Sequence, residues 1–245
     1  MYPPVFSLIH PTARLKNGGL TWMRACSRWR STCGSWSNCE YVLSIHRRQA
    51  ELPNSGPEFD FGVAYRAALA SLNFIWERYI LAVNVLAPTM VNNGNCAALA
   101  STVKVLVDVN DDLEPCTQWD LLLLEAIAKA GKTLNDEFVI KVSHGTYQPD
   151  LITHPIVSRA YFERIGPTDP RYIGYGCDDE LTEMAYRDGV VIDATHIVFE
   201  HRHPSMGTRV GDALDAHNGR PEVWANKEEI RAARRAAGFP KVELR

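Results

Sequence analysis

One stretch constrains this sequence more than any other. Residues 103–115, VKVLVDVNDDLEP, pass from an apolar run straight into a group of polar and acidic side chains. The apolar half is rich in the β-branched residues that a short buried strand needs. In open α/β sheets, ligands bind beyond the carboxyl ends of the strands, and adjacent carboxylates there suit a hard divalent cation. An acidic turn, in which Asp and Asn serve only turn geometry, accounts for the same residues equally well at this point.

Composition and charge narrow the class of protein. The chain has 245 residues, of which 46% are hydrophobic and 22% charged, with a net charge of −3. These values are ordinary for a soluble globular protein, and the lack of a broad basic run makes nucleic acid binding unfavoured. No apolar stretch reaches the ~18 residues of a membrane span, and residues 1–14 lack the features of a signal peptide. The six cysteines form no CxxC motif, so we expect reduced thiols in a cytoplasmic protein.

Apolar runs and helical patterns alternate along the first two thirds of the chain. Strands are predicted at residues 5–9, 40–45, 79–85, 103–107 and 137–142. Helices are predicted at 15–33, 61–78, 90–102, 119–132 and 159–165, and loops at 50–58 and 150–158. This alternation predicts parallel pairing with right-handed crossovers. The predicted fold class is therefore α/β, a single Rossmann-like domain with a mostly parallel central sheet flanked by helices.

The last third of the chain combines an acidic helix start with histidines at a strand end. A loop with glycine and tyrosine at 172–176 precedes a predicted helix at 178–188, whose first turn is acidic. Two short strands, 190–192 and 196–199, lead to the sequence HRHP. The tail after residue 206 is polar and has one charged helix, predicted at 227–237. We expect this tail to be peripheral to the chemistry.

Four motifs occur in one order: PTAR at 11–14, NDD at 110–112, GYGCDDELTEMAYRDG at 174–189 and HRHP at 201–204. Together they resemble the inverting, nucleotide-sugar-dependent glycosyltransferases of the GT-A fold, of the family 2 type, and especially its short phage and bacterial versions. The resemblance implies a GT-A-like domain at 1–206 and a polar C-terminal extension with one helix at 207–245. It also implies transfer of a sugar from a nucleoside-diphosphate sugar, most commonly a UDP-sugar, to an acceptor hydroxyl, with Mn²⁺ or Mg²⁺ as cofactor.

The resemblance assigns the metal site residue by residue. Asp111 and Asp112 match the acidic metal-binding pair, and Asn110 stands in the first acidic place. His201 or His203 matches the late histidine that completes the metal shell. The motif is NDD rather than a strict DxD, so which carboxylate binds the metal directly stays open.

The catalytic and nucleotide-side residues follow from the same resemblance. Asp178 matches the catalytic base, and Glu180 is its acidic companion. The residues that match segments contacting or flanking the nucleotide are Pro11, Thr12, Arg14, Asn93 and Asn95. His46 stands at the end of the second strand, where the family usually has an acidic residue that helps to hold the nucleoside. This departure leaves the donor base open.

The residues themselves also suit this chemistry. A divalent metal neutralises the leaving diphosphate, while a carboxylate on the acceptor side accepts the proton of the hydroxyl. Crowding of Asp178 with its acidic neighbours predicts a raised pKa for at least one carboxyl group. Acidic residues are, however, favoured in any first helical turn by the helix dipole. Two alternatives remain. One is a non-catalytic nucleotide- or sugar-binding relative, which the lack of an acidic residue at His46 favours, and the other is a nucleotidyltransferase that uses the same acidic strand end.

Overall fold

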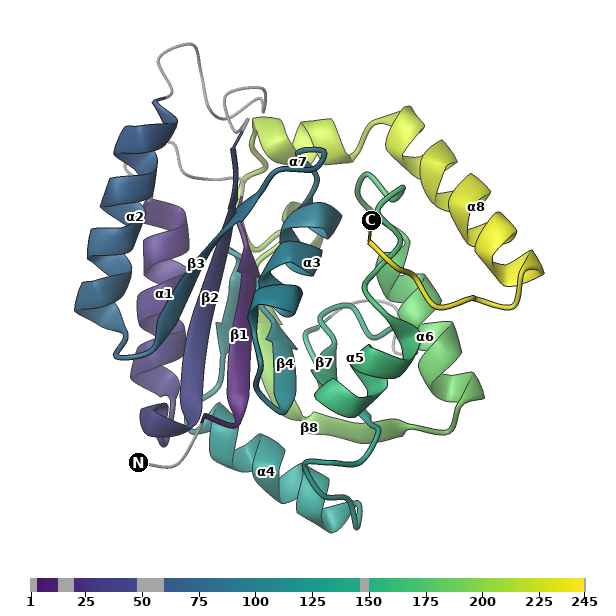
Figure 1. Ribbon diagram of the computed structural model, residues 1–245, viewed down its shortest axis with the longest axis horizontal. Helices are drawn as coiled ribbons and strands as arrows, with labels where there is room; N and C mark the ends of the chain where they lie inside the picture. Colours follow the sequence, from purple (N-terminus) through teal and green to yellow (C-terminus); the bar gives the residue numbers. More distant parts are fainter. Residues whose placement is uncertain (1–3, 13–19, 48–59, 146–149, 245) are drawn as a thin grey trace.

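Residues 4–12, 20–47, 60–145 and 150–244 are described by the computed structural model, in which helices cover both faces of a central sheet (Figure 1). The strands are β1 (Phe6–Pro11), β2 (Cys39–His46), β3 (Tyr79–Asn84), β4 (Val105–Asp108), β5 (Leu113–Pro115), β6 (Val139–Ser143), β7 (Ile156–Ser158) and β8 (Val191–His201). The helices are α1 (Leu20–Thr32), α2 (Phe61–Ile75), α3 (Met90–Ala100), α4 (Trp119–Lys129), α5 (Arg159–Ile165), α6 (Cys177–Arg187), α7 (Ala213–Asn218) and α8 (Pro221–Ala236).

The strand order is β3-β2-β1-β4-β7-β6-β8-β5. The first four strands are parallel, as the alternation of strands and helices predicts. β6 and β8 are also parallel, but β7 runs antiparallel to its two neighbours, and β5 runs antiparallel to β8. The α/β class with a mostly parallel sheet is thus confirmed, and its second half is mixed.

Alternate side chains of each central strand face opposite layers of helices. In β4, Val105 and Val107 pack into the larger core under α1, α2 and α4, whereas Leu106 packs into the smaller core under α3. β1 divides in the same way, with Phe6 in the larger core and Ile9 in the smaller one. This two-residue period is the reason that the apolar runs in the sequence are continuous, because both faces of these strands are buried.

A cluster of aromatic rings fixes the segment that follows the acidic turn. The rings of Trp29, Trp119 and Phe199 pack edge to face, with centroid distances of 5.2 Å from Trp29 to each of the others. The indole N–H of Trp29 donates to the carbonyl oxygen of Leu113 at 3.2 Å. Because Leu113 begins β5, the cluster anchors residues 110–112 at the edge of the sheet.

Three predicted details of the second half are wrong. The predicted loop 150–158 ends in the strand β7, which is too short for a period to be visible in the sequence. β5 was not predicted for the same reason. The two short strands predicted at 190–192 and 196–199 are one strand, β8. Asp193 and Thr195, which suggest a turn, hydrogen-bond to each other near a register shift within the β6–β8 pairing.

The polar tail contains two helices rather than one. α7 has a capping box built from Asp212 and Asp215, and α8 begins at Pro221, six residues before the predicted start of the charged helix. Figure 1 shows α7 at the end of the sheet to which β1 and β2 point, and α8 beside α6. The predicted loop at 50–58 and the first residues of the helix predicted at 15–33 lie outside the described residues.

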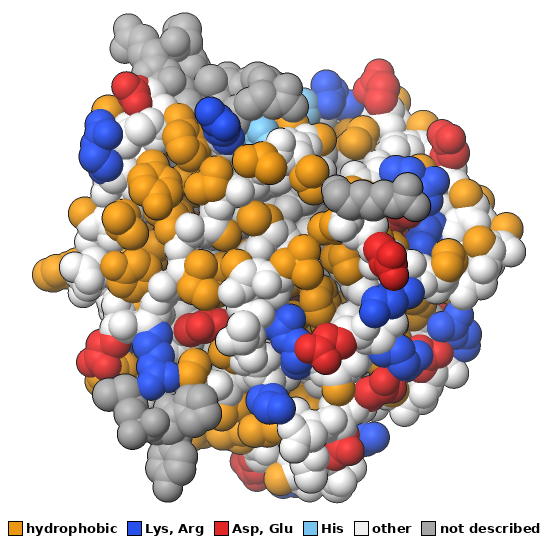
Figure 2. All heavy atoms as spheres, in the orientation of Figure 1, with side chains coloured by type: hydrophobic (Ala, Val, Ile, Leu, Met, Phe, Trp, Pro, Cys, Tyr) orange, Lys and Arg blue, Asp and Glu red, His pale blue; other side chains and the backbone are white. Residues whose placement is uncertain are grey.

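The face of the molecule in Figure 2 has an apolar side and a charged side. Hydrophobic side chains gather over α2, on the left of Figure 2. Within this helix, Phe74 and Val63 are 92% and 56% exposed. Acidic and basic side chains interleave over α6 and α8, on the right. The charged side is built from ion pairs between the two helices, for example Arg235 with Glu183.

Candidate active site

A cavity of about 310 Å³ opens at the carboxyl ends of β1 and β4, between α3, α6 and the tail. This is where parallel α/β sheets bind ligands. The sequence-predicted residues that line the cavity are Pro11, Asn95, Asn110, Asp111, Asp112, Asp178, Glu180, His201 and His203. Thr12, His46 and Asn93 are buried and do not line it. Arg14 lies outside the described residues.

Asp111 is turned toward the end of β1. Its carboxylate accepts hydrogen bonds from the Thr12 hydroxyl at 3.1 and 3.2 Å and lies 3.0 Å from Nε2 of His10. His10 is fully buried, and its Nδ1 contacts the hydroxyl of Tyr41. Sequence reasoning did not single out His10 as a site residue. The available signal was its place at the end of the first strand, next to the strand that ends in NDD.

Asp112 faces the other way, toward the end of β8. Its Oδ1 lies 3.6 Å from Nε2 of His201, and its Oδ2 accepts a hydrogen bond of 3.0 Å from Nη2 of Arg209. Burial lowers the pKa of His201 despite the opposing effect of Asp112, which favours the neutral imidazole. His203 instead places its Nδ1 2.7 Å from Oγ of Ser205. Of the two predicted histidines, His201 is therefore the one that faces an acidic side chain of the NDD motif.

The Asp112–His201 pair fits a divalent cation. A carboxylate oxygen and a neutral imidazole nitrogen each bind a transition metal at ~2.0–2.2 Å, so two ligands of one ion are separated by up to about 4 Å. The 3.6 Å between Oδ1 and Nε2 lies within this range. Mixed oxygen and imidazole ligands suit Mn²⁺ as well as the later transition metals. The carboxylate of Asp111 is engaged by His10, near the end of β1, and by Thr12, just after it.

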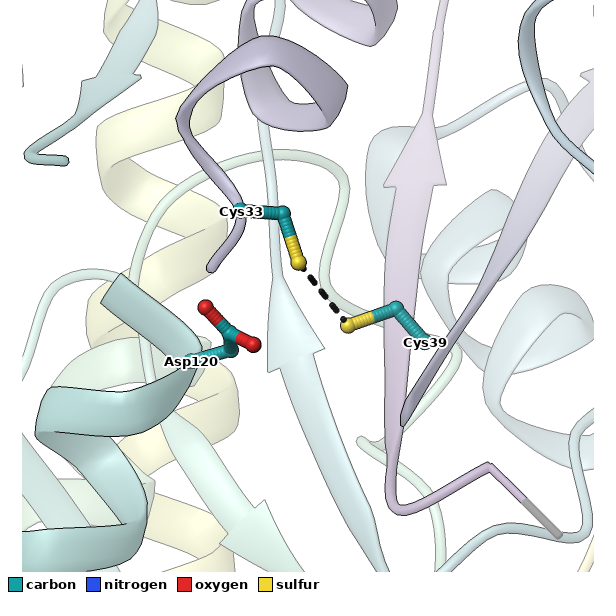
Figure 3. Close-up of side chains that lie close together, drawn as sticks. All are labelled: Cys33, Cys39 and Asp120. Carbon is teal, nitrogen blue, oxygen red and sulfur yellow. Dashed lines mark hydrogen bonds between the residues drawn. The ribbon is translucent and has the colours of Figure 1, made fainter. Parts of the chain in front are cut away.

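A tighter group of metal-type side chains lies elsewhere. Within the described segments, one group of three places all its ligand atoms within 4.8 Å of one another, namely Cys33, Cys39 and Asp120. Figure 3 shows the two thiols pointing toward each other, with the carboxylate beside them. Cys39 is the first residue of β2, so this group sits at the opposite end of the sheet from the cavity.

Asp178 occupies the first turn of α6. Its Oδ1 accepts backbone N–H bonds from Asp179 at 3.0 Å and from Gly176 at 3.3 Å. Burial, and then the negative charge of Asp179, raise the pKa of Asp178. Gly176 has φ 104°, and a Cβ there would lie 2.7 Å from Cγ of Lys227. The predicted rise in pKa within this acidic run is confirmed, with burial as a larger cause than repulsion.

The other two acidic residues in the first turn of α6 are paired with tail cations. Asp179 lies 2.8 Å from Nζ of Lys227. Glu180 accepts hydrogen bonds from Arg234 at 2.6 and 2.8 Å and from the Tyr172 hydroxyl at 2.8 Å. The Glu180 and Arg234 side chains are each only 5% exposed. Glu180, predicted as a companion of the base, therefore joins α6 to the tail.

The tail after residue 206 forms part of the cavity wall. The expectation that the tail lies away from the site is therefore wrong. Leu214, Asp215 and Asn218 line the cavity together with Arg234. Its polarity misled the prediction, because the tail docks by ion pairs more than by an apolar face. Within the part of the chain that the structure describes, residues 207–244 therefore belong to the same packed unit as the site.

Several predicted nucleotide-side residues have partners inside the protein. The Oδ1 of Asn93 accepts a 2.8 Å hydrogen bond from Asn84, and Asn95 exchanges two hydrogen bonds with the backbone of Thr168. Nε2 of His46 lies 2.5 Å from a backbone carbonyl oxygen beyond β3. Of these three side chains, only Asn95 lines the cavity, and its hydrogen bonds tie α3 to the segment at Thr168.

Several buried polar atoms that belong to residues lining the cavity lack a hydrogen-bond partner among the described residues. Asn110 contacts Nδ1 of His154 at 3.3 Å, and the same nitrogen lies 3.5 Å from Oδ2 of Asp108. Among the described residues, no hydrogen-bond partner is present for the buried atoms Asn110 Oδ1, Thr153 Oγ1 and His154 Nε2. Buried polar atoms are normally satisfied, so this part of the cavity suits a polar ligand or water. From the sequence, His154 is expected to be a loop residue or an acceptor contact, because β7, which follows it, is too short to show a period.

No model of a known protein family matches this sequence, and no curated protein matches it. Solved structures do match the fold. S. aureus TarS 1–349 aligns with a TM-score of 0.59 and 12% identity, covering 98% of this chain and 76% of that one. Its complex with UDP aligns with a TM-score of 0.57 and 11% identity, covering 80% of this chain. In that second alignment, the chain spans 59% of the length of its relative.

Two further solved structures match the fold of this chain. The mannosyltransferase PcManGT from Pyrobaculum calidifontis, in complex with GDP-Man and Mn²⁺, aligns with a TM-score of 0.55 and 16% identity over 100% of this chain and 77% of that one. Glucosyl-3-phosphoglycerate synthase from Mycobacterium tuberculosis, with Mn²⁺ and UDP-glucose, aligns with a TM-score of 0.55 and 12% identity over 94% and 80%. The chain thus has the GT-A glycosyltransferase fold. None of its described helices is long and apolar enough to cross a membrane.

Proposed function

We propose that this protein is a metal-dependent glycosyltransferase that moves a sugar from a nucleoside-diphosphate sugar to an acceptor hydroxyl with inversion. One observation carries the proposal. A single cavity is lined by the Asp112–His201 pair, which suits a cation, and by Asp178, a carboxyl group whose pKa is raised by burial. A cation-type pair and a base-type carboxyl group in one cavity are the parts that sugar transfer needs.

Each residue has a distinct role in this proposal. Asp112 and His201 would hold Mn²⁺ or Mg²⁺, which supplies charge neutralisation for a leaving diphosphate. Asp178 accepts the proton of the acceptor hydroxyl, and its raised pKa makes it a better base than an ordinary aspartate. The partnerless polar atoms of Asn110 and Thr153 offer hydrogen bonds to ligand hydroxyls. With one base on the acceptor side, displacement occurs once, and the anomeric configuration inverts.

The donor is proposed to be a UDP-sugar, with GDP-sugars as the next class to examine. Structures with the same fold are complexes with UDP, UDP-glucose and GDP-mannose. His46 ends β2 where a nucleoside-binding acidic residue is expected, and its ring is engaged by a backbone carbonyl oxygen. Nucleoside recognition would therefore rely on other groups, such as Pro11 and Asn95 on the cavity wall.

Calorimetry with UDP, followed by donor hydrolysis in the presence of Mn²⁺, tests this function. We expect Mn²⁺ to strengthen UDP binding in the wild type and to have little effect in Asp112→Asn. A panel of UDP- and GDP-sugars should then show slow, Mn²⁺-dependent release of free sugar. Metal-independent UDP binding, unchanged in the variant, would refute the cation site. Binding without any turnover would identify a non-catalytic relative, and pyrophosphate release from UTP with a sugar phosphate would identify a nucleotidyltransferase.

A further inference from the structure

Arg209, in the tail, is held by a dense set of contacts at the edge of the cavity. Its Nη2 donates to Oδ2 of Asp112 at 3.0 Å and to Oδ1 of Asp215 at 2.7 Å. Its Nη1 donates to the second oxygen of Asp215 at 2.6 Å, and its Nε donates to the carbonyl oxygen of Arg202 at 2.8 Å. The guanidinium thus joins the NDD motif to a tail residue in the first turn of α7.

The two oxygens of Asp112 have separate partners. Oδ1 points toward His201, and Oδ2 is bound by Arg209. The side chains of Asp112 and Arg209 are 12% and 22% exposed, so this contact is partly shielded from water. A carboxylate that is held on one oxygen cannot rotate freely, and its other oxygen keeps a fixed direction. Partners of this kind orient metal-binding side chains in many proteins.

We propose that Arg209 is a positioning residue for the divalent-cation site, and that it acts through Asp112. This inference rests on the proposed function, because it assumes that Asp112 binds the cation. Asp215 completes the arrangement by neutralising the guanidinium, so that the triad of Asp112, Arg209 and Asp215 keeps a net negative charge. Cation binding and docking of the tail are thereby linked, and each stabilises the other.

A competing arrangement would give the opposite result. If the guanidinium occupied the place of the cation, its removal would strengthen cation binding. The contacts of Arg209 with the tail argue against this. Nη1 donates to Asp215 and to the carbonyl oxygen of Val210, and Nη2 is shared between Asp215 and Oδ2 of Asp112. The sign of the change in affinity therefore separates positioning from competition.

The test is a titration of the 245-residue chain with Mn²⁺ alone. Electron paramagnetic resonance measures the concentration of free Mn²⁺ at each point of the titration. Losing an orienting partner typically lowers metal affinity by about 10–100-fold, and we expect Arg209→Met to raise the Kd by that factor. Arg209→Lys should recover part of the loss, because a single ammonium can still reach Asp112. Arg235→Met is the matched control, since it removes an exposed tail arginine that pairs with Glu183.

The outcomes are distinct. Should Arg209→Met bind Mn²⁺ as tightly as the wild type or more tightly, positioning is refuted while the cation site stands. A wild type that binds no Mn²⁺ overturns both the positioning role and the cation site. If Arg209→Met does not fold, Asp215→Asn is used in its place. This change removes the negative charge that binds the Arg209 guanidinium and keeps a side chain of the same shape. Asp215→Asn should also raise the Kd, and an unchanged value would overturn the proposal.

A second, independent observation concerns the thiols of Cys33 and Cys39 (Figure 3). Their sulfur atoms lie 3.5 Å apart across the turn from α1 to β2. Asp120 fixes this turn, because its two carboxylate oxygens accept the N–H groups of Gly34 at 2.6 Å and Ser35 at 2.8 Å. Since both carboxylate oxygens already serve the backbone, thiol chemistry suits the group better than cation binding.

We infer that this pair is a dithiol that a small-molecule disulfide, such as oxidised glutathione, converts to an intramolecular disulfide. Cys33 is half-buried and Cys39 is buried, so Cys33 is the thiol that meets the oxidant. The Cys33 thiolate attacks one sulfur of glutathione disulfide and releases glutathione. Cys39 then loses its proton and attacks Cys33, which releases the second glutathione and leaves the protein disulfide. Two thiols are oxidised, and one disulfide is reduced.

Mass spectrometry tests the inference on one tryptic peptide, because residues 31–47 contain both cysteines and no internal Lys or Arg. After exposure to oxidised glutathione and alkylation in denaturant, this peptide should be lighter by two hydrogen atoms than the unlabelled dithiol and should carry no label. The peptides with Cys96 and Cys116 are the controls and should stay labelled. Two labels on peptide 31–47, or a stable glutathione adduct, would overturn the proposal. In Cys39→Ser, a glutathione adduct on Cys33 is expected.

Discussion

Replacing Arg234 with methionine should destabilise the protein far more than replacing its neighbour Arg235. Arg234 and Glu180 are each 5% exposed, and they are joined by hydrogen bonds of 2.6 and 2.8 Å. Removing one partner leaves a buried charge without compensation, which costs about 3–5 kcal/mol. At about 2–4 °C per kcal/mol for a domain of this size, the Tm should fall by about 6–20 °C.

A double variant separates the lost charge from lost packing. Glu180→Gln removes the negative charge and keeps an oxygen that accepts the Tyr172 hydroxyl hydrogen bond. Combined with Arg234→Met, it should recover more than half of the lost free energy of unfolding, because no unpaired charge remains. Without Arg234→Met, Glu180→Gln leaves Asp169 as the one acidic partner of the guanidinium among the described residues, with 3.8 Å between Nε and Oδ2, and should destabilise the protein.

Denaturant unfolding of the wild type, the two single variants and the double variant measures these free energies. Arg235→Met is the matched control, because its side chain is 55% exposed and pairs with Glu183 on the same two helices. Exposed pairs contribute little, so this control should unfold close to the wild type. The reasoning fails if Arg234→Met costs no more than Arg235→Met, or if the double variant is no more stable than Arg234→Met.

Three further predictions concern the site. Asp178→Asn should lower kcat by about 10²–10⁴-fold with little change in donor affinity, whereas Asp179→Asn should lower kcat much less. Initial rates of both variants test this, and NMR of the product gives the stereochemistry. Because burial raises the pKa of Asp178 and its deprotonated form is the base, activity should rise with pH through that raised pKa. Lys227→Met should move this acid limb to higher pH, since the positive charge of Lys227 lowers the pKa of Asp178; a pH–rate profile unchanged in the variant contradicts it. Removal of divalent metal with EDTA should abolish the gain in UDP affinity, and Mn²⁺ should restore it in the wild type but not in Asp112→Asn, as calorimetry can show.

The parallel half of the fold could be predicted because each of its strands is buried on both faces. Short, mostly apolar runs such as residues 103–107 are typical of such strands, and their carboxyl ends necessarily meet at one edge of a parallel sheet. This is why Pro11 could be assigned to the same place as Asp111 and Asp112, although it is far from them in the chain. β7 could not be predicted in this way, because three residues show no period, and the partners of His154 remained hidden with it.

The direction in which each side chain of a motif points could not be predicted from the sequence either. Asp111 and Asp112 are adjacent, yet one is bound by Thr12 at the end of β1 and the other faces His201 at the end of β8. The turn between β4 and β5 sets this split, and its geometry depends on where β5 is anchored by Trp29. A local pattern such as NDD therefore indicates a candidate site but not which of its side chains faces a cation.

The acidic run in α6 shows how the tail contributes to the assignment of the base. Asp178, Asp179 and Glu180 are consecutive, and each points about 100° away from the last around the helix. Lys227 neutralises Asp179, and Arg234 neutralises Glu180, so both carboxylates are engaged in docking the tail. Asp178 keeps a raised pKa at the cavity wall. The proposed base is thus distinguished from two similar carboxyl groups by cations about 50 residues away in the sequence, in a segment whose polarity alone suggests a peripheral extension.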